Sequence, residues 1–330
     1  MKNVIVALLV FIALGCKDKE SNKVSVRLKW AYQAQFAGYL VADKLGFYKE
    51  QGLDATILPA GPDIKSFMTV ANETDQFGVA MPNQIISARS NGVPLTIIAQ
   101  IMQDSPYRYV LKGKNKIDSL AQLRGKKIGL WLKADEAEFT AMLKKSKMSL
   151  KDMEVTPQEY TIIPFLEDKY ILSAVTVYNE LNQIRENGYE GNKLQVLSPK
   201  DYGTAFLGDM LFCKQDYLNK NPETVKKFLT ATLKGWQYTM QNPEKALKIV
   251  LSYNKELNES QQRKQLEAVV QLIKSGKTLT NGLGYIDEKE YSNIEQILRE
   301  SGQIQNKVEI STLYDSKPWE SIDNQIKKIK

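Results

Sequence analysis

The sequence predicts an α/β protein with two lobes and a helical C-terminal tail. Strand-like and helix-like segments alternate from residue 24 to about residue 200, as they do in sheets built from βαβ units. After about residue 215 the pattern becomes mostly helical. The chain has 330 residues, which is more than one hydrophobic core usually organises, so two lobes are expected.

The first 16 residues, MKNVIVALLVFIALGC, resemble a bacterial lipoprotein signal. Lys2 supplies a positive charge, and the apolar run over 4–14 is shorter than the 20 or so residues of a membrane-spanning helix. Small residues precede Cys16, so we expect Cys16 to be lipidated (palmitate included) and residues 17–23 to form a polar tether. An ordinary signal peptide with an incidental cysteine is the alternative.

The first βαβ unit follows the tether. Apolar residues alternate over 24–30 and predict a strand whose period-two face includes Trp30. A helix is expected over 36–45, ended by Gly46 as a C-cap, and a second strand over 53–61. The two strands of such a unit are expected to be parallel.

The same alternation continues through the middle of the chain. Buried apolar runs predict strands and amphipathic runs predict helices, with glycine or proline at most boundaries. We expect strands over 76–80, 93–102, 123–131, 171–177 and 192–198, and helices over 81–92, 136–147 and 178–188.

Composition argues against several classes of function. The chain has no histidine, which removes histidine-based catalytic triads and histidine–metal clusters. Cys213 is the only cysteine outside the leader, and a small buried hydrophobe is its expected role. The net charge is +7, but lysines and glutamates are interleaved along the helices, so we expect a solvated surface and no nucleic-acid partner. No motif argues for a cofactor or a metal.

Rings and amides gather where the predicted strands end. In an α/β sheet, ligands bind outside the carboxyl ends of the strands. The residues at those ends are 30–36, 81–83, Trp131, 178–180 and 201–202. Aromatic rings stack on a flat heterocycle and amide groups pair with its edge, so the sequence predicts a site for such a molecule.

Structural roles remain open for several of these residues. Trp30 is as compatible with the core as with a ligand wall, and Gln33 and Gln35 could be solvated loop residues. Asn83 could be a helix N-cap, which is compatible with ligand contact. Glu180 could accept hydrogen bonds from a ligand or favour a helix N-terminus electrostatically.

Four segments in order resemble one protein family. They are LKWAYQAQFAGYLVADKLGFYKEQGLDATILPAGPD (28–63), FGVAMPNQIISARSNGVPLTIIAQIMQ (77–103), SLAQLRGKKIGLW (119–131) and VTVYNELNQIRENG (175–188). They look like the type II substrate-binding proteins of ATP-driven importers, in the branch related to thiamine-pyrimidine synthase. QAQFAG and GPDI look most like the riboflavin-binding lipoproteins of that branch. The resemblance covers about residues 24–250.

The resemblance implies the type II periplasmic-binding-protein fold, with two α/β lobes joined by two crossover segments and a ligand held between them. Lobe I would comprise residues 24–108 and 209–330, and lobe II residues 109–208, with crossings near 106–109 and 206–212. Carried over by motif, the ligand contacts would be Trp30, Gln33, Gln35, Gly61, Pro62, Asp63, Asn83, Trp131, Tyr178 and Asn179. Glu180 and Asp201 join them from their positions after strand ends.

The resemblance also implies a function. The protein would be a monomer held by its lipid in the cell envelope, facing the periplasm or the exterior. It would capture a vitamin-like heterocycle, riboflavin in the first instance, and deliver it to the permease and ATPase of an ABC importer. The sequence departs from relatives at Tyr170, at Leu172 and in LKADEAEF (132–139), all expected to flank the cleft, so the fold is better determined than the ligand.

Four alternatives compete with riboflavin binding, and one of them, a purely structural surface lipoprotein, would not need aromatic residues at every strand end. The ligand could be the formylaminopyrimidine or hydroxymethylpyrimidine precursor of thiamine, although that branch usually carries histidine in the first loop. An alkylsulfonate-like anion would call for arginine or lysine, and Arg89 and Arg108 are the arginines near predicted strand ends. A pyrimidine synthase would need a histidine and a cysteine-rich motif that the sequence lacks, so we expect no enzyme.

Overall fold

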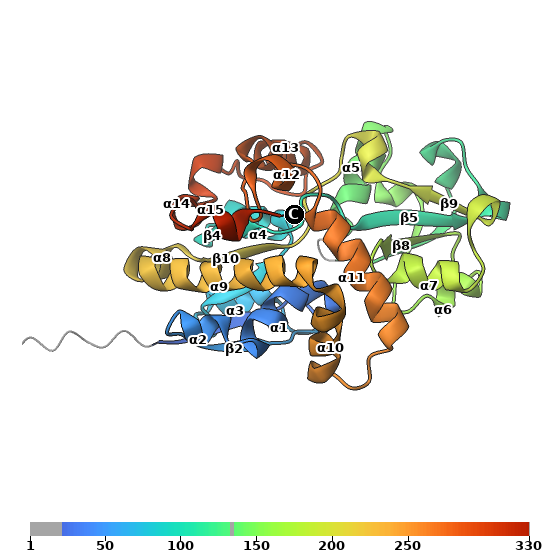
Figure 1. The fold of residues 1–330 in the computed structure, drawn as a ribbon. Helices are drawn as coiled ribbons and strands as arrows, with labels where there is room; N and C mark the ends of the chain where they lie inside the picture. The colour runs from blue at the N-terminus through green and yellow to red at the C-terminus, as the bar shows by residue number, and fades with distance from the viewer. Residues whose placement is uncertain (1–21, 133–134, 330) are drawn as a thin grey trace, which may run out of the picture.

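The computed structural model describes residues 22–132 and 135–329 and contains two five-stranded sheets, each covered by helices (Figure 1). Sheet one has the order β2-β1-β3-β10-β4 and sheet two the order β7-β6-β8-β5-β9. The predicted α/β fold, with two lobes, two crossings and a helical tail, is confirmed. The leader, Cys16 and most of the tether lie outside the described residues. Lys23, expected in the tether, is the first residue of β1.

Each sheet mixes parallel strands with one strand that arrives from the other lobe. In sheet one β1 pairs in parallel with β2 and β3, as the βαβ pattern predicted, while β10 runs antiparallel between β3 and β4. In sheet two β6 pairs in parallel with β7 and β8, while β5 runs antiparallel to β8 and β9. The strands are β1 (Lys23–Arg27), β2 (Asp54–Leu58), β3 (Phe77–Ala80), β4 (Leu95–Gln100), β5 (Tyr107–Lys112), β6 (Lys127–Leu130), β7 (Glu154–Pro157), β8 (Leu172–Thr176), β9 (Leu194–Leu197) and β10 (Met210–Lys214).

The chain crosses between the sheets twice, from β4 to β5 and from β9 to β10. We call residues 101–106 the first crossing and residues 198–209 the second crossing. The residue bounds expected for the two lobes stay a prediction.

The helices follow the amphipathic patterns of the sequence. They are α1 (Ala37–Lys44), α2 (Phe47–Glu50), α3 (Ser66–Ala71), α4 (Pro82–Ser90), α5 (Ala137–Lys145), α6 (Ile163–Leu166), α7 (Glu180–Glu186), α8 (Gln215–Lys220), α9 (Pro222–Gln241), α10 (Pro243–Tyr253), α11 (Glu259–Ile273), α12 (Thr278–Asn281), α13 (Glu288–Glu300), α14 (Lys317–Glu320) and α15 (Asn324–Lys327). A 3-10 turn, η1 (Ala34–Phe36), precedes α1, and another, η6 (Pro199–Tyr202), lies in the second crossing. Within residues 22–132 and 135–329, none of these helices is long and apolar enough to cross a membrane.

Some predicted boundaries were wrong. The first strand ends at Arg27, so Trp30 lies in the loop after it and does not continue the strand's buried face. A turn over 177–179 separates β8 from α7, where a strand running directly into a helix was expected. The sequence patterns did not reveal the short elements α3, α6 and β7, nor the strands β5 and β10 that follow the two crossings.

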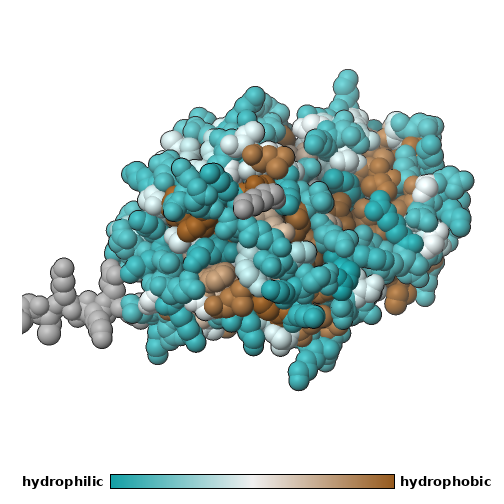
Figure 2. All heavy atoms as spheres, viewed as in Figure 1, coloured by the Kyte–Doolittle hydropathy of each residue, from teal (hydrophilic) through white to brown (hydrophobic). Residues whose placement is uncertain are grey.

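The tail belongs to the first lobe, where the 20-residue helix α9 packs along α1. Two glycines permit this close approach. A Cβ atom at Gly38 would lie 2.2 Å from the buried ring of Trp236, and one at Gly235 would lie 2.0 Å from the carbonyl oxygen of Gly38. Figure 1 shows α9 alongside α1 and the long helix α11 placed beside both lobes. The face drawn in Figure 2 is largely hydrophilic, with apolar residues in separate patches.

A buried glutamate joins the two crossings. Glu138 on α5 accepts a hydrogen bond from the Ser105 hydroxyl of the first crossing (2.8 Å) and one from the Phe206 backbone N–H of the second crossing. Burial raises the pKa of the Glu138 carboxyl to about 8, against the lowering effect of those two hydrogen bonds and of Arg108. Arg108 also donates to the carbonyl oxygens of Ser105 and Tyr107, which gives it a structural role at the first crossing.

Gly38→Ala is predicted to destabilise the protein, because the added methyl group has no space beside Trp236. We expect the free energy of unfolding to fall by about 1–3 kcal/mol, the usual cost of overpacking. Urea unfolding followed by tryptophan fluorescence measures this. Gly61→Ala is the matched control, since no heavy atom lies within 4 Å of a Cβ there and it should change little. Equal stability of the two variants would contradict the packing argument.

The Glu138 carboxyl predicts a pH dependence of stability. Its folded-state pKa of about 8 exceeds the ordinary value of 4.5, so between these values the folded protein holds a proton that the unfolded chain has released. The free energy of unfolding should therefore fall as pH rises through this window, by up to about 1.4 kcal/mol per pH unit.

Urea unfolding of the wild type and of Glu138→Gln at several pH values from 5 to 8 tests this prediction. The glutamine variant, which stays neutral throughout, should show a shallower slope. Parallel slopes for the two proteins would show that Glu138 does not titrate in this range.

Candidate functional site

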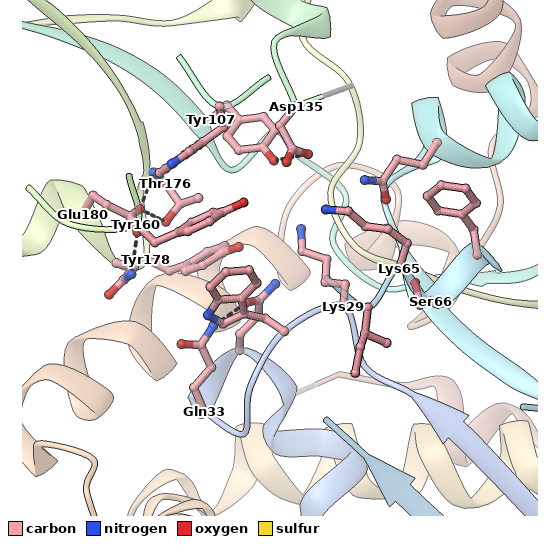
Figure 3. A pocket seen from close by; sticks show the side chains of 17 residues that line it. Lys29, Gln33, Lys65, Ser66, Tyr107, Asp135, Tyr160, Thr176, Tyr178 and Glu180 are labelled. Atoms are coloured by element: carbon pink, nitrogen blue, oxygen red, sulfur yellow. Dashed lines mark hydrogen bonds between the residues drawn. The ribbon is translucent and has the colours of Figure 1, made fainter. Parts of the chain in front are cut away.

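A cavity of about 150 Å³ lies between the two lobes, at the ends of their central strands. Figure 3 shows its side chains converging from both sides. The first lobe contributes the loop after β1, the start of α3 with the residues before it, and one residue of α4. The second lobe contributes the start of β5 and the loops after β6, β7 and β8. The lining residues are Lys29, Trp30, Gln33, Gln35, Ile64, Lys65, Ser66, Phe67, Gln84, Tyr107, Trp131, Asp135, Tyr160, Thr176, Tyr178, Asn179 and Glu180.

Seven of the residues proposed from the sequence lie together in this lining. They are Trp30, Gln33, Gln35, Trp131, Tyr178, Asn179 and Glu180. They come from the two lobes and from loops far apart in the chain, and they meet because both sheets present strand ends to the same space. A contact of any of them with a ligand stays a prediction.

Five other proposed residues lie outside the lining: Gly61, Pro62, Asp63, Asn83 and Asp201. The first three form a turn closed by a bridge between Gly61 and Ile64, and the lining begins only at Ile64. Asn83 is buried on α4, which turns the next residue, Gln84, toward the cavity in its place. The N-cap of α4 is Met81, so the capping role considered for Asn83 was wrong. Asp201 is exposed on η6, in the second crossing.

The departures from related sequences do not all flank the cavity. Tyr170 covers Gly129, where a Cβ would lie 2.6 Å from its ring, and Leu172 is fully buried in β8. Both are absent from the lining, although the same segment supplies Thr176 and the residues 178–180 that do line it. Asp135, from the segment 132–139, does line the cavity.

The two glutamines of the first loop belong to a buried hydrogen-bond network. Gln33 Nε2 donates to Gln35 Oε1 (2.7 Å), and Gln35 Nε2 donates to Asp209 Oδ2 (2.7 Å). Lys29 Nζ lies 2.9 Å from Asp209 Oδ1 and forms an ion pair with it. Gln35 is only 2 % exposed, and both ends of its amide have protein partners. Its amide therefore orders the loop. Gln33 is the more exposed of the two, although its Oε1 also accepts a long hydrogen bond from Gln265 Nε2 at 3.4 Å.

Helix α11 holds the same loop from behind. The backbone N–H of Ala34 donates to Gln262 Oε1 (2.7 Å), and that of Gln35 donates to Gln265 Oε1 (3.1 Å). Between these two glutamines on α11, Lys264 forms an ion pair with Glu186 of α7 at 2.6 Å. The helix thus contacts the first loop of one lobe and a helix of the other, and it links their positions.

Aromatic rings form a continuous row across the cavity. Tyr107 and Trp131 of the second lobe have ring centroids 6.1 Å apart, and Trp131 and Tyr160 have centroids 6.3 Å apart with nearly parallel planes, 13° from each other. Tyr160 then contacts Trp30 of the first lobe, with a centroid distance of 4.5 Å. The aromatic wall that the sequence predicted is therefore larger than expected, because it includes Tyr107 and Tyr160.

The carboxylates of the cavity are engaged by protein groups. Glu180 accepts from the backbone N–H and the hydroxyl of Thr176, at 2.9 and 2.7 Å, and from Asn179 Nδ2 at 2.6 Å. The Tyr107 hydroxyl donates to Asp135 at 3.1 Å. Burial raises the pKa of Asp135, opposed by the positive charge of Lys29 and by this hydrogen bond.

A metal site or a nucleophile would each require particular side chains. Within the described residues, no group of histidine, cysteine, aspartate and glutamate side chains could hold a metal ion. Cys213 is fully buried in β10, and burial raises the pKa of its thiol, so it is neither a cavity residue nor a thiolate nucleophile. Arg89 and Arg108 do not line the cavity, whereas Lys29 and Lys65 do.

Sequence reasoning missed ten lining residues, and tertiary structure explains several omissions. Tyr107 begins β5, and it reaches the ligand edge only because β5 runs antiparallel to its neighbour β8. Ile64, Lys65, Ser66 and Phe67 accompany α3, which the pattern did not reveal, and Gln84 is one residue beyond the one proposed. Lys29 and Thr176 adjoin the proposed residues, so a broader reading of the strand ends would have found them. Asp135 lies in the segment 132–139, which was expected near the cleft although no residue of it was proposed as a contact, and Tyr160 lies in a loop with no local signal.

A family model and several characterised proteins are similar to this chain. The family model described as "NMT1/THI5 like" matches residues 33–246. Riboflavin-binding protein RibY of Chloroflexus aurantiacus is 24% identical over 301 residues, which cover 89% of this chain and 85% of that protein. The formylaminopyrimidine-binding protein of Halalkalibacterium halodurans is 24% identical, with 73% of each chain covered.

Other similar proteins carry different names. The 4-amino-5-hydroxymethyl-2-methylpyrimidine phosphate synthase THI11 of Saccharomyces cerevisiae is 26% identical and covers 75% of this chain and 76% of its own. Among solved structures, the alkanesulfonate-binding protein SsuA from Xanthomonas axonopodis pv. citri bound to MOPS superposes with a TM-score of 0.66 at 12% identity, covering 89% of this chain and 98% of that one. That likeness establishes the type II periplasmic-binding-protein fold. The family match spans well over half of the sequence, and the chain therefore belongs to the NMT1/THI5-like family.

Proposed function

We propose that this protein is a solute-binding protein that captures a flat, vitamin-like heterocycle between its lobes and delivers it to an ABC importer. The observation that carries the proposal is the pair of tryptophan rings, Trp131 and Trp30, which line a cavity edged by amides in one row with Tyr107 and Tyr160. Rings of this kind stack on a planar ligand, and side-chain amides recognise donors and acceptors on its edge. Riboflavin is the proposed ligand, because the similarity to RibY covers 89% of this chain.

The expected cell-envelope location belongs to the same proposal. Lipidation at Cys16 would hold the protein at the membrane beside its permease and ATPase, and a monomer of two lobes is sufficient to clasp one ligand. Lobe closure around the ligand is a hinge motion, and the importer would recognise the closed form.

An aminopyrimidine precursor of thiamine is the second candidate. Its support is the similarity to the formylaminopyrimidine-binding protein and the small volume of the cavity. A pocket for a drug-sized molecule usually has about 300 Å³ or more. The cavity of about 150 Å³ suits a single ring, whereas a fused tricyclic ring would require the site to open.

Two other functions have less support. A sulfonate-type anion would meet Lys29 and Lys65, but Lys29 is already paired with Asp209. A synthase role is suggested by the name of the yeast relative, but this chain has no histidine and Cys213 lies buried outside the cavity. A role without enzymatic activity fits the residues better.

The direct experiment is purification of the protein without residues 1–16, followed by absorption spectroscopy and mass analysis of extracted small molecules. We expect a flavin spectrum, or quenching of riboflavin fluorescence on titration. If an aminopyrimidine raises the melting temperature and riboflavin does not, the ligand is the aminopyrimidine precursor of thiamine and the riboflavin proposal is rejected.

Trp131→Ala is predicted to weaken riboflavin binding by at least tenfold. The variant loses a stacking surface worth about 0.5–1.5 kcal/mol together with the apolar area of the indole. Fluorescence titration measures the dissociation constant, and circular dichroism checks that the variant is folded.

Trp319→Phe serves as the control for this prediction. Trp319 packs on Tyr285 in the tail and is absent from the cavity lining, so its replacement should leave affinity unchanged. Unchanged affinity in folded Trp131→Ala would remove Trp131 from the proposed site.

A further inference from the structure

Tyr160 stands in the middle of the aromatic row, at the boundary between the lobes. Its ring lies 4.5 Å from that of Trp30 in the first lobe, tilted by 47°, and 6.3 Å from that of Trp131 in the second lobe, nearly parallel to it. Figure 3 shows the Tyr160 side chain extending into the cavity beside Tyr178. The ring therefore covers aromatic surface that a planar ligand would use.

The backbone next to Tyr160 is held in place. Gln158 is buried, donates to the Ala174 carbonyl oxygen at 2.7 Å and accepts from the Ala174 backbone N–H at 3.0 Å. Trp131 Nε1 donates to the carbonyl oxygen of Glu159 at 3.3 Å. Tyr160 itself is 51 % exposed. The ring can therefore rotate toward solvent while the loop keeps its position.

The spacing of the rings does not admit another ring while Tyr160 is in place. A planar molecule between two parallel rings needs about 7 Å, twice the contact distance of roughly 3.5 Å between carbon atoms. Trp131 and Tyr160 are 6.3 Å apart between centroids, and Trp30 is already in contact with the Tyr160 ring. Only movement of Tyr160 opens both tryptophan surfaces to a larger ligand.

We propose that Tyr160 is a specificity-determining gate, whose ring occupies the stacking position on Trp30 in the free protein and must swing out before a fused-ring ligand can enter. This inference rests on the proposed function and deepens it, because it names the residue that selects the size of the ligand's ring system. A single-ring pyrimidine fits beside Tyr160, whereas the three fused rings of a flavin displace it.

If Tyr160 is a gate, removal of its ring should strengthen riboflavin binding, whereas removal of an aromatic residue that contacts the ligand weakens it. The Trp30–Tyr160 contact competes with the ligand, so Tyr160→Ala should bind riboflavin about two- to tenfold more tightly than the wild type, the range that one aromatic pair contributes. The gain should lie mainly in the association rate, since the free protein no longer has to release the ring. Tyr160→Phe keeps the ring and should match the wild type.

Stopped-flow fluorescence with riboflavin, and with an aminopyrimidine as the single-ring comparison, measures these quantities. Aminopyrimidine affinity should change less than riboflavin affinity in Tyr160→Ala. Weakened or unchanged riboflavin binding in a folded Tyr160→Ala variant would overturn the gate, because a wall residue weakens binding when it is removed. Trp131→Ala removes a ring that is proposed to contact the ligand, so it should weaken riboflavin binding in the same assay.

A readout without ligand separates this inference from the proposed function. In protein labelled with 5-fluorotryptophan, the Trp30 signal is identified as the one lost in Trp30→Phe. Motion of Tyr160 on and off Trp30 should broaden that ¹⁹F resonance in the wild type, and Tyr160→Ala should shift and sharpen it. A wild type that shows this behaviour but binds no riboflavin rejects the riboflavin proposal alone. An identical, sharp Trp30 resonance in both proteins rejects the gate.

Discussion

The arrangement of the site depends on the buried carboxylate of Asp209. Its side chain accepts a hydrogen bond from Gln35 and pairs with Lys29, which fixes the loop after β1. Its backbone carbonyl oxygen accepts from the N–H groups of Ile101 and Met102 in the first crossing, at 3.2 and 3.0 Å. One residue of the second crossing thus holds the first crossing and the first binding loop together. A buried carboxylate is tolerated here because both of its oxygens have close partners.

The hydrogen bonds around Gln35 hold the first binding loop in place, and they leave the recognition of a ligand to other groups. Gln35 faces the cavity, yet both ends of its amide are bonded within the protein, and Gln262 and Gln265 of α11 accept from the loop's backbone. Polar groups that satisfy one another leave few free donors and acceptors for a ligand. The aromatic row supplies most of the remaining surface, so shape and ring stacking carry more of the proposed selectivity than hydrogen bonds do.

Each crossing is also tied to α5 through a second buried acid. Glu138 contacts Ser105 in one crossing and the Phe206 backbone in the other, so α5 would follow any movement of the hinge. Asp209 and Glu138 differ in their surroundings. Asp209 has an ammonium group at 2.9 Å, whereas neutral donors bond to Glu138, and burial therefore raises the pKa of Glu138. Asp209 is thus held by an ion pair and Glu138 by hydrogen bonds from neutral groups.

The sequence by itself determined the fold class and most of the aromatic and amide residues at the strand ends, such as Trp30 and Trp131, because alternating apolar patterns and local composition are properties of short segments. It could not place Tyr160, Tyr107 or Asp209 at the site. Tyr160 lies in a loop without a local signal. Tyr107 reaches the cavity through the antiparallel strand β5, and the return of the second crossing brings Asp209 against Gln35 of the first loop. Only the tertiary structure decided these positions, because they depend on the pairing of strands far apart in the chain.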